Sequence, residues 1–311
     1  MPDASLEAEE LRTAFANQLL SMISTHNLML VTGDLGYGVF DDFAELFPNN
    51  FLNAGITEQS MTSMAAGLAD SDWIPVLYSI ANFPTLRNLE QIRNDIAYPN
   101  RHVIICAVGA GLAYGSLGTS HFAIEDVGVL RTLPNMRILS PSGPKSASLA
   151  LKSAVNIPLP TYLRLGKAGE VNIFHSASDA HQALRLIIKG QADACVISSG
   201  SIGSLVLDTM SKGIWKPSFY SIEELWPLSG EIKDLIRRQK RILVVEEHVK
   251  TGGLYSILAE EILSCGAKAE IKSLAVDPLL LQSAGSQDFL RDISGLNQRD
   301  LQVALEWLER S

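Results

Sequence analysis

A glutamate that follows a glycine turn is the residue of this sequence best placed to do chemistry. The stretch FLNAGITEQSMTSMAAGLA (residues 51–69) predicts a short strand, a turn at Gly55 and a helix that begins directly afterwards. Glu58 then falls in the first turn of that helix. By its spacing alone, an acid there does no more than complement the positive end of the helix dipole. A role as a positioned acid therefore needs support from the rest of the chain.

Two further groups of residues could also take part in chemistry. Glu246, Glu247 and His248 are adjacent in the sequence and could form an acid–base cluster. Gly252 and Gly253 precede a predicted helix, and the first N–H groups of a helix can bind an anion. For the glycine pair we expect the simpler role of a tight turn into the helix.

The composition is that of a folded protein with an acidic balance. Of the 311 residues, 47% are hydrophobic and 19% are charged, and the formal net charge is -9. This charge argues against nucleic acid or an anionic membrane as the main partner. No apolar run approaches the ~20 residues of a membrane span, and the N-terminus does not resemble a signal peptide. We expect a cytoplasmic protein whose three cysteines, none at metal-ligand spacing, are buried free thiols: Cys106, Cys195 and Cys265.

Strands and helices alternate along the first half of the chain. Nearly continuous apolar runs predict strands that are buried on both faces, and segments with helical spacing separate them. This alternation predicts a parallel sheet with helices on both sides. The predicted strands are 28–33, 74–80, 102–108, 136–139 and 161–165, and the predicted helices are 56–70, 86–98, 122–133 and 144–156.

The same alternation starts again in the second half. The predicted strands there are 193–200, 216–222, 241–247 and 269–276, and the predicted helices are 201–213, 229–239, 252–265 and 298–310. We therefore predict an α/β protein of two domains, residues 1–168 and a smaller domain of residues 190–311, joined by a linker over 169–189.

The segment around Glu58 resembles a motif of the transketolase family. NAGITEQ is similar to the GI-x-EQ motif of that family's pyrimidine-binding domain, which binds thiamine diphosphate. The resemblance implies that Glu58 hydrogen-bonds N1′ of the aminopyrimidine. This contact favours the imino tautomer that removes the proton from thiazolium C2, so the protein supplies a positioned acid and the cofactor supplies the electron sink.

Other segments extend the resemblance over nearly the whole chain. VTGDLG resembles the first strand and loop of the pyrimidine-binding domain, which implies that Asp34 and Leu35 lie near the cofactor. SIANFPTLRNLEQIRNDIAYPN implies that Phe83 lines the pyrimidine pocket, where an aromatic face suits a flat ring. SHFAIEDVGVLRTLPNMRILSPSG implies that His121 faces the reacting centre and assists proton movements.

Three cations match family positions that contact a substrate phosphate. TYLRLGK resembles the last strand of the domain, and Lys167 falls where relatives carry an arginine, with Arg164 as the nearby alternative. Lysine can hold a phosphate as a point charge but not in a bidentate manner. Arg12, in ELRTAF, matches a second phosphate contact of the family.

The second half resembles the C-terminal domain of transketolases. ILVVEEHVKTGGLYSILAEEIL is similar to that domain's VEEH and GG segment. In the family this domain chiefly supports dimer packing, so we expect Glu246, Glu247 and His248 to be structural.

A motif that full-length transketolases contain is missing from this sequence. Those enzymes hold the diphosphate through Mg²⁺ in an upstream domain with a GDG motif, which we do not find here. The resemblance therefore implies that this chain is the C-terminal (β) subunit of a split transketolase. It would have no metal ligand of its own, would pair with an N-terminal (α) subunit that holds Mg²⁺ and the diphosphate, and would self-associate within an α2β2 assembly.

Four positions that face the substrate in ordinary transketolases differ in this sequence. Leu117 replaces an aspartate that contacts a sugar hydroxyl, Gly109 replaces a phosphate-binding histidine, Gly38 replaces a serine and Ile80 replaces a phenylalanine. A site that loses a buried polar partner loses its discrimination for that hydroxyl. We therefore expect a modified sugar rather than the usual pentose phosphates.

The leading hypothesis is transfer of a two-carbon ketol unit from a ketose to an aldose. One alternative is a subunit similar to 1-deoxyxylulose-5-phosphate synthase or to the β chain of a 2-oxoacid dehydrogenase. Another is a non-catalytic assembly partner that kept the fold, as the changed loop at 115–121 allows.

Overall fold

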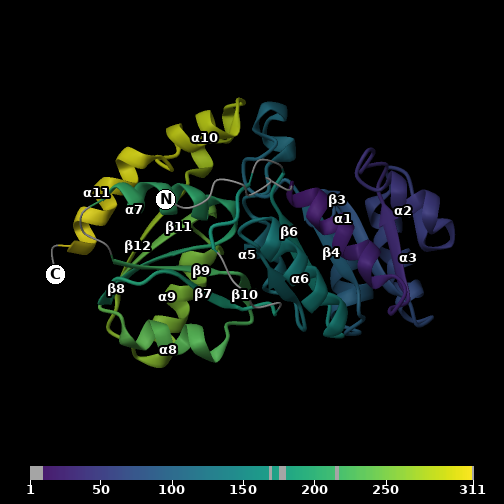
Figure 1. Ribbon diagram of the computed structural model, residues 1–311, viewed down its shortest axis with the longest axis horizontal. Coiled ribbons are helices and arrows are strands. Elements are labelled where there is room, and N and C mark those ends of the chain that lie inside the picture. The colour runs from purple at the N-terminus through teal and green to yellow at the C-terminus, as the bar shows by residue number, and fades with distance from the viewer. Residues whose placement is uncertain (1–9, 168–169, 175–179, 214–216, 310–311) are drawn as a thin grey trace, which may run out of the picture.

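A computed structural model describes residues 10–167, 170–174, 180–213 and 217–309 of the chain. Each half of the sequence forms most of one sheet, and the two sheets, each with its helices, lie side by side (Figure 1). The first half contains α1 (Leu11–Met22), β1 (Leu28–Thr32), α2 (Asp41–Leu46), β2 (Phe51–Asn53), α3 (Glu58–Ala69), β3 (Ile74–Ile80), α4 (Leu89–Gln91), the π-helical turn η2 (Ile92–Ala97), β4 (Ile104–Val108), the 3-10 turns η3 (Gly115–Leu117) and η4 (Thr119–His121), α5 (Asp126–Leu130), β5 (Arg137–Leu139), α6 (Pro144–Asn156) and β6 (Thr161–Leu165).

The second half contributes the remaining elements. They are β7 (Leu184–Ile188), β8 (Gln191–Ser198), α7 (Gly203–Lys212), β9 (Pro217–Ile222), β10 (Glu224–Trp226), α8 (Gly230–Arg238), β11 (Arg241–Val249), α9 (Leu254–Cys265), β12 (Glu270–Val276), α10 (Gln287–Ile293) and α11 (Gln298–Glu309). Seven strands form the first sheet in the order β10-β5-β6-β4-β3-β1-β2, and five form the second in the order β12-β11-β8-β9-β7. Pairing is parallel except for β10 with β5 and β7 with β9, so the predicted α/β class is confirmed.

Successive side chains of the central strands point to opposite faces of the first sheet. Side chains such as Leu30 and Val76 pack under α1 and α6. Their neighbours Val31 and Leu77 point to the opposite face, beneath α3 and η2, because successive strand residues face opposite sides. This second face is continuous with the apolar side of the second sheet under α8 and α9, so one hydrophobic core spans both halves.

The predicted strands and most predicted helices are confirmed, but the helix predicted over 86–98 is present only as the short α4 and the π-helical turn η2. The structure shortens the helix predicted over 122–133 to α5. It also adds the antiparallel edge strands β7 and β10. β7 lies within the stretch 169–189 that the sequence predicts as a linker, and β10 comes from the second half but pairs in the first sheet. The division into domains at 168 and 190 stays a prediction.

β10 depends on a tertiary contact. The Arg137 guanidinium donates to both carboxylate oxygens of Glu224, at 3.1 and 2.7 Å. A segment of three residues between two other elements has no periodicity that sequence reading could detect. The pairing of β10 with β5 therefore became visible only in the folded chain.

A buried group of polar side chains joins the two halves. Asp126 accepts hydrogen bonds from the Tyr162 hydroxyl at 2.6 Å and from Arg164 Nε at 2.7 Å. Arg164 also donates to the carbonyl oxygen of Glu247 at 3.1 Å, and His248 Nε2 lies 3.6 Å from Asp126 Oδ1. Because charges out of water need partners, these contacts fix how the halves meet.

The Gly252–Gly253 turn packs against the first half and leads into α9. Gly252 has a φ of +85°, and a Cβ there would lie 2.7 Å from the Cα of Gly128. The first N–H groups of α9 donate to the carboxylate of Glu246, from Leu254 at 2.6 Å and from Tyr255 at 3.0 Å. The group at this helix start is therefore the chain's own Glu246 carboxyl, whose pKa burial raises to about 8, and the structural role expected for the glycine pair agrees with these contacts.

The remaining sequence expectations concern cysteines, metal ligands and membrane spans. Cys106 and Cys195 are buried, whereas Cys265 is partly exposed, so the expectation of burial was wrong for that residue. Within the described residues, no group of three or more His, Cys, Asp or Glu side chains could hold a metal ion. Among the helices of these residues, none combines the length and apolar character needed to cross a bilayer.

The neutral, buried state of His248 predicts acid sensitivity. Burial lowers the pKa of His248 to about 4, although the nearby Asp126 carboxylate opposes this shift. In the unfolded chain, a histidine has a pKa of ~6.5 and takes up a proton at pH values at which the buried His248 stays neutral. The free energy of unfolding should therefore fall as the pH drops from about 6.5 to about 4, by roughly 2 kcal/mol from this residue.

Denaturant unfolding of wild type and His248→Gln at pH 7 and pH 4.5 measures this contribution. The variant should lose less stability between the two pH values than wild type does. His26→Gln, at a partly exposed histidine, is the control and should behave as wild type. Identical losses in wild type and His248→Gln would contradict the assignment.

Candidate active site

The sequence-predicted residues collect at one edge of the first sheet. Asp34 and Phe83 follow β1 and β3, and Lys167 follows β6, so each comes after the carboxyl end of a parallel strand. Glu58 begins α3, which follows the neighbouring strand β2. Open parallel sheets bind ligands at this edge.

Glu58 is buried at the start of α3 and is held by an arginine. Its side chain is 3% exposed, and its Oε2 lies 2.8 Å from Nη1 of Arg87. Two contacts fasten the Arg87 segment to α3. Gln59 donates to the carbonyl oxygen of Arg87 at 3.2 Å, and Asn88 donates to Thr62 Oγ1 at 2.5 Å. The acid and its partner are therefore held together by several independent contacts.

Phe83 and His121 extend the row of contacting side chains that starts with Glu58 and Arg87. The Cζ atom of Arg87 lies 4.3 Å from the centre of the Phe83 ring. The His121 ring meets Phe83 edge-on, with 5.1 Å between ring centres. Asn82, beside Phe83, donates to the carbonyl oxygen of Ser120 at 2.5 Å and so ties the two segments together. Three predicted residues thus lie side by side with Arg87 among them.

Arg87 is a site residue that the sequence analysis did not single out. It lies in the same SIANFPTLRNLEQIRN segment as Phe83, four positions further on. A cation four residues after an aromatic was the available signal, although the residues between them form turns rather than a helix. It was not sufficient, because the partner Glu58 is far away in sequence.

Asn53 fixes the loop that carries Asp34. Its Oδ1 accepts the backbone N–H groups of Asp34 at 3.1 Å and of Gly55 at 2.9 Å. The Asp34 carboxylate accepts the Tyr37 hydroxyl and the Asn53 amide, and these hydrogen bonds lower the pKa of Asp34. One side chain therefore links the turn before Glu58 to the Asp34 loop.

Two cavities open beside this loop, and one of the predicted cations, Arg12, lines the larger one. That cavity has a volume of about 210 Å³, and the neighbouring one about 190 Å³. Leu35 lines both, and Arg12 lines the larger. Lys167 does not line the cavity. Its Nζ lies 4.7 Å from the ring centre of Tyr114, which does line the cavity. The lining residues of the larger cavity are Arg12, Leu35, Gly36, Tyr37, Tyr78, Ile80, Val108 and Tyr114.

Arg164, the alternative to Lys167, does not reach this cavity. Its side chain is 6% exposed and forms the buried ion pair with Asp126. Its Nη2 donates a hydrogen bond to the carbonyl oxygen of Ala123 at 2.7 Å. The prediction that Arg164 contacts substrate is therefore corrected, because its donors are already used inside the protein.

Of the positions that depart from the family pattern, one lines this cavity and a second lies beside a residue of its lining. Ile80 lines it, and Gly109 has a φ of +92°. A Cβ on Gly109 would lie 2.2 Å from the Tyr114 ring, so this tyrosine fills the space beside the glycine. Leu117 is 54% exposed on η3. Gly38 has open space around it.

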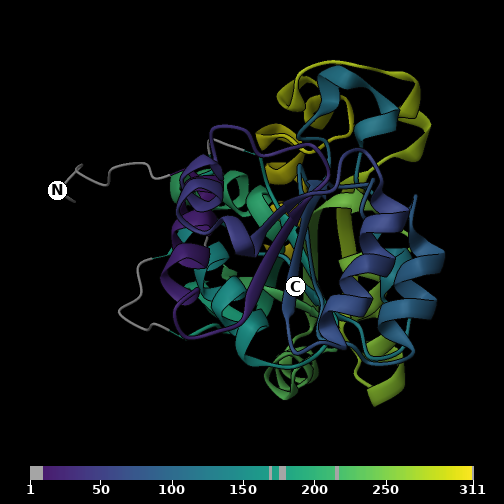
Figure 2. The same ribbon diagram turned by 90° about the vertical axis from the view of Figure 1, so that its right-hand side faces the viewer.

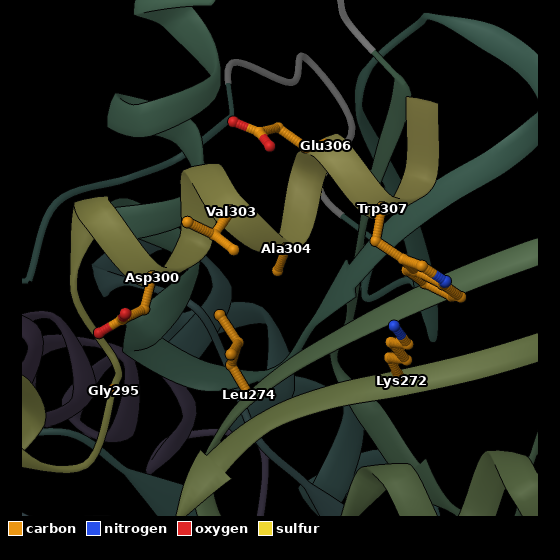
Figure 3. Close-up of a pocket in the computed structure, with 8 residues that line it drawn as sticks. All are labelled: Lys272, Leu274, Gly295, Asp300, Val303, Ala304, Glu306 and Trp307. Carbon is orange, nitrogen blue, oxygen red and sulfur yellow. The ribbon is translucent and has the colours of Figure 1, made fainter. Parts of the chain in front are cut away.

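A larger cavity lies elsewhere in the described residues. It is an open groove of about 560 Å³ between β12 and α11 (Figure 3). Lys272 points toward the Trp307 ring, 4.6 Å from its centre, and apolar side chains form much of the remaining lining. None of the predicted site residues lines this groove, so we place the site at the edge of the first sheet, where the chemistry is concentrated.

Comparisons with known proteins point to one family. The family "Transketolase, pyrimidine binding domain" matches residues 8–169. One of the subunits of apulose-4-phosphate transketolase from Phocaeicola vulgatus is 32% identical over 263 residues, which cover 81% of this chain and 83% of that protein. A putative transketolase C-terminal section of Methanocaldococcus jannaschii is 30% identical, with 85% of each chain covered.

The solved structures agree with this match. A split-gene transketolase, solved as an inactive β4 tetramer, superposes with a TM-score of 0.84 at 28% identity, covering 97% of this chain and 98% of that one. The transketolase from Leishmania mexicana superposes with a TM-score of 0.78 at 19% identity, with 98% of this chain on 47% of that one. This chain therefore corresponds to about half of a full-length transketolase fold. It belongs to the transketolase family and contains that family's pyrimidine-binding domain.

Proposed function

We propose that this chain is the β subunit of a split, thiamine-diphosphate-dependent transketolase that transfers a two-carbon ketol unit from a ketose to an aldose. The observation that carries the proposal is the buried Glu58 carboxylate, in a row with Phe83 and His121. The names of the two relatives, a transketolase subunit and a transketolase C-terminal section, support it. The split-gene neighbour is inactive as a tetramer of β chains, which supports the need for a partner.

The residues present fit one end of the proposed cofactor. Glu58 offers a carboxyl group to a ring nitrogen, and Phe83 offers an aromatic face to a flat ring. The relatives that this chain matches over most of their own length are a transketolase subunit and a transketolase C-terminal section, and the split-gene β chain is covered to 98%. We therefore assign Mg²⁺ and the diphosphate to a separate α subunit, within an α2β2 enzyme of carbohydrate metabolism in the cytoplasm.

Catalysis requires Glu58 to hold a proton. When bound, the cofactor supplies the electron sink for breaking and forming a carbon–carbon bond. Glu58 would hydrogen-bond the ring nitrogen N1′ of the bound cofactor, and it would donate its proton there as a neutral acid. His121, partly exposed beside Phe83, is positioned to move protons on the sugar. Asp34 and Leu35 form the neighbouring wall of the cofactor pocket.

Arg87 occupies the position that the cofactor ring needs. Its guanidinium lies on the Phe83 ring and donates to Glu58, which are the two contacts proposed for the aminopyrimidine. Cofactor binding must therefore displace Arg87, and the displacement lowers the apparent affinity.

The donor sugar is proposed to be a phosphorylated ketose other than the usual pentose phosphate. Arg12 and Lys167 supply two cations around the 210 Å³ cavity and fit an anionic end group. Leu117 removes a hydroxyl partner, and Tyr114 fills the space beside Gly109. Two relatives are named for apulose 4-phosphate, a sugar outside the pentose phosphate pair.

Replacing the proposed acid tests the catalytic role of this chain. In the complex with its α subunit, Glu58→Gln should lower kcat by at least about 100-fold, because an amide cannot supply the proton. Glu45→Gln, at an exposed glutamate of α2, is the control. Full activity of Glu58→Gln would instead support a non-catalytic assembly role. Carbon dioxide release from pyruvate without an aldose would favour the synthase or dehydrogenase alternative.

Removing the arginine tests the displacement step. Arg87→Met should tighten thiamine diphosphate binding to the complex about fivefold, because the cofactor no longer competes with an ion pair worth ~1 kcal/mol. Titration calorimetry measures this affinity. Arg93→Met is the matched control, since Arg93 also stacks on an aromatic ring, at 4.7 Å from that of Tyr98. Weaker binding in Arg87→Met would show that Arg87 belongs to the cofactor-bound site.

The two cations provide a test of the substrate class. Lys167→Met and Arg12→Met should each raise KM for a phosphorylated ketose about tenfold, the loss expected for one charge-assisted hydrogen bond. Lys152→Met, at an exposed lysine of α6, is the control. An equal rise in KM for the unphosphorylated sugar would contradict phosphate recognition. Ordinary turnover of xylulose 5-phosphate with ribose 5-phosphate would contradict the modified-sugar hypothesis.

A further inference from the structure

The loop from Gly109 to Phe122, here called the His121 loop, cannot hold a fixed shape by itself. Gly109, Gly111 and Gly118 have φ angles of +92°, +66° and +78°, which glycine adopts without strain. Mutual backbone hydrogen bonds between Gly111 and Ala123, at 3.0 and 2.9 Å, close the base. The tip consists of the short 3-10 turns η3 and η4, which are weak elements. The loop therefore needs support from its surroundings.

Glu247, on β11 of the second half, supplies that support at the base. Its side chain is 5% exposed, and its Oε1 accepts the backbone N–H of Leu112 at 2.6 Å. The same carboxylate accepts the Gln287 amide at 2.8 Å and Arg291 Nε at 2.7 Å, both from α10. A Cβ on Gly111 would lie 2.7 Å from Cγ of Glu247, so only glycine lets the carboxylate approach the loop.

Helix α10 touches the tip of the same loop. The Gly285 N–H, just before α10, donates to the Gly115 carbonyl oxygen at 3.1 Å. A Cβ on Gly115 would lie 2.3 Å from Leu290 of α10, which shows how closely the two segments pack. Figures 1 and 2 both show α10 beside this teal-blue segment. One carboxylate thus binds the base of the loop and the helix that supports its tip.

We infer that Glu247 is a positioning residue that fastens the His121 loop to α10 and so holds His121 and Leu117 in place for the sugar. The consequence for turnover rests on the proposed function, but the mechanical coupling does not. Glu58 and Phe83 lie outside the loop. Loss of the Glu247 charge should therefore alter sugar KM and kcat and leave cofactor affinity nearly unchanged.

Hydrogen exchange of the full chain tests the coupling directly. In Glu247→Gln, the amides of residues 112–121 should exchange at least about tenfold faster, because an amide cannot satisfy both Arg291 and Leu112. Glu246→Gln is the matched control: this adjacent, buried glutamate binds the start of α9 through Leu254 and Tyr255. Its faster exchange should be confined to the amides near Leu254.

A second variant and a kinetic measurement complete the test. Arg291→Met removes the α10 partner and should reproduce the loop exchange even if Glu247→Gln fails to fold, while Arg291→Lys should restore part of the protection. In the complex, both Glu247→Gln and Arg291→Met should raise sugar KM about tenfold without changing the Kd of thiamine diphosphate.

Unchanged loop exchange in Arg291→Met, or equal loop exchange in Glu246→Gln, would overturn the inference. This result is independent of the proposed function, since exchange requires neither cofactor nor sugar. Failure of the proposed function would appear instead as full activity of the Glu58→Gln complex.

Discussion

A charge that leaves water needs a partner, and the candidate site depends on how Glu58 meets this requirement. The carboxylate is buried at the start of α3, and in this chain its partner is the Arg87 guanidinium stacked on Phe83. In the proposed enzyme, the ring nitrogen of the cofactor takes over that position. Because Glu58 is buried, its carboxylate needs a partner from within the chain when the cofactor is absent.

The same requirement joins the two halves of the chain. Asp126 and Arg164 pair inside the first half, and His248 lies beside them from the second. Glu247 accepts hydrogen bonds from a loop of the first half and from α10 of the second. Partnering of buried charges thus fixes the contact between the halves, and it gives the second half a role in shaping the site beyond packing.

The family uses the same fold both within a longer chain and as a separate one. This chain covers 47% of the Leishmania mexicana transketolase but 98% of the split-gene β chain. A site that draws its acid from one chain and its diphosphate ligands from another is complete only after assembly. In the proposed enzyme, Arg87 would be the partner of the buried acid before the second subunit binds.

The sequence by itself determined the α/β class and the central strands, and it predicted the group of residues around Glu58 as the site. The strands depend on local patterns, because continuous apolar runs predict buried strands. The chemistry of Glu58 came instead from the resemblance of a short motif to the transketolase family. Phe83 and His121 came from segments that keep the family pattern, and the structure brings them together.

Only the tertiary structure decided which polar side chains were free to act. Arg164 and Lys167 are three positions apart in sequence, yet Arg164 is committed to Asp126 while Lys167 stacks on Tyr114 beside the open cavity. Arg87 and Glu58 lie 29 residues apart, and Glu247 and Leu112 lie 135 apart. Pairings over such separations produce no periodic pattern in the sequence. They form only when folding brings the two groups together and a buried carboxylate needs a partner.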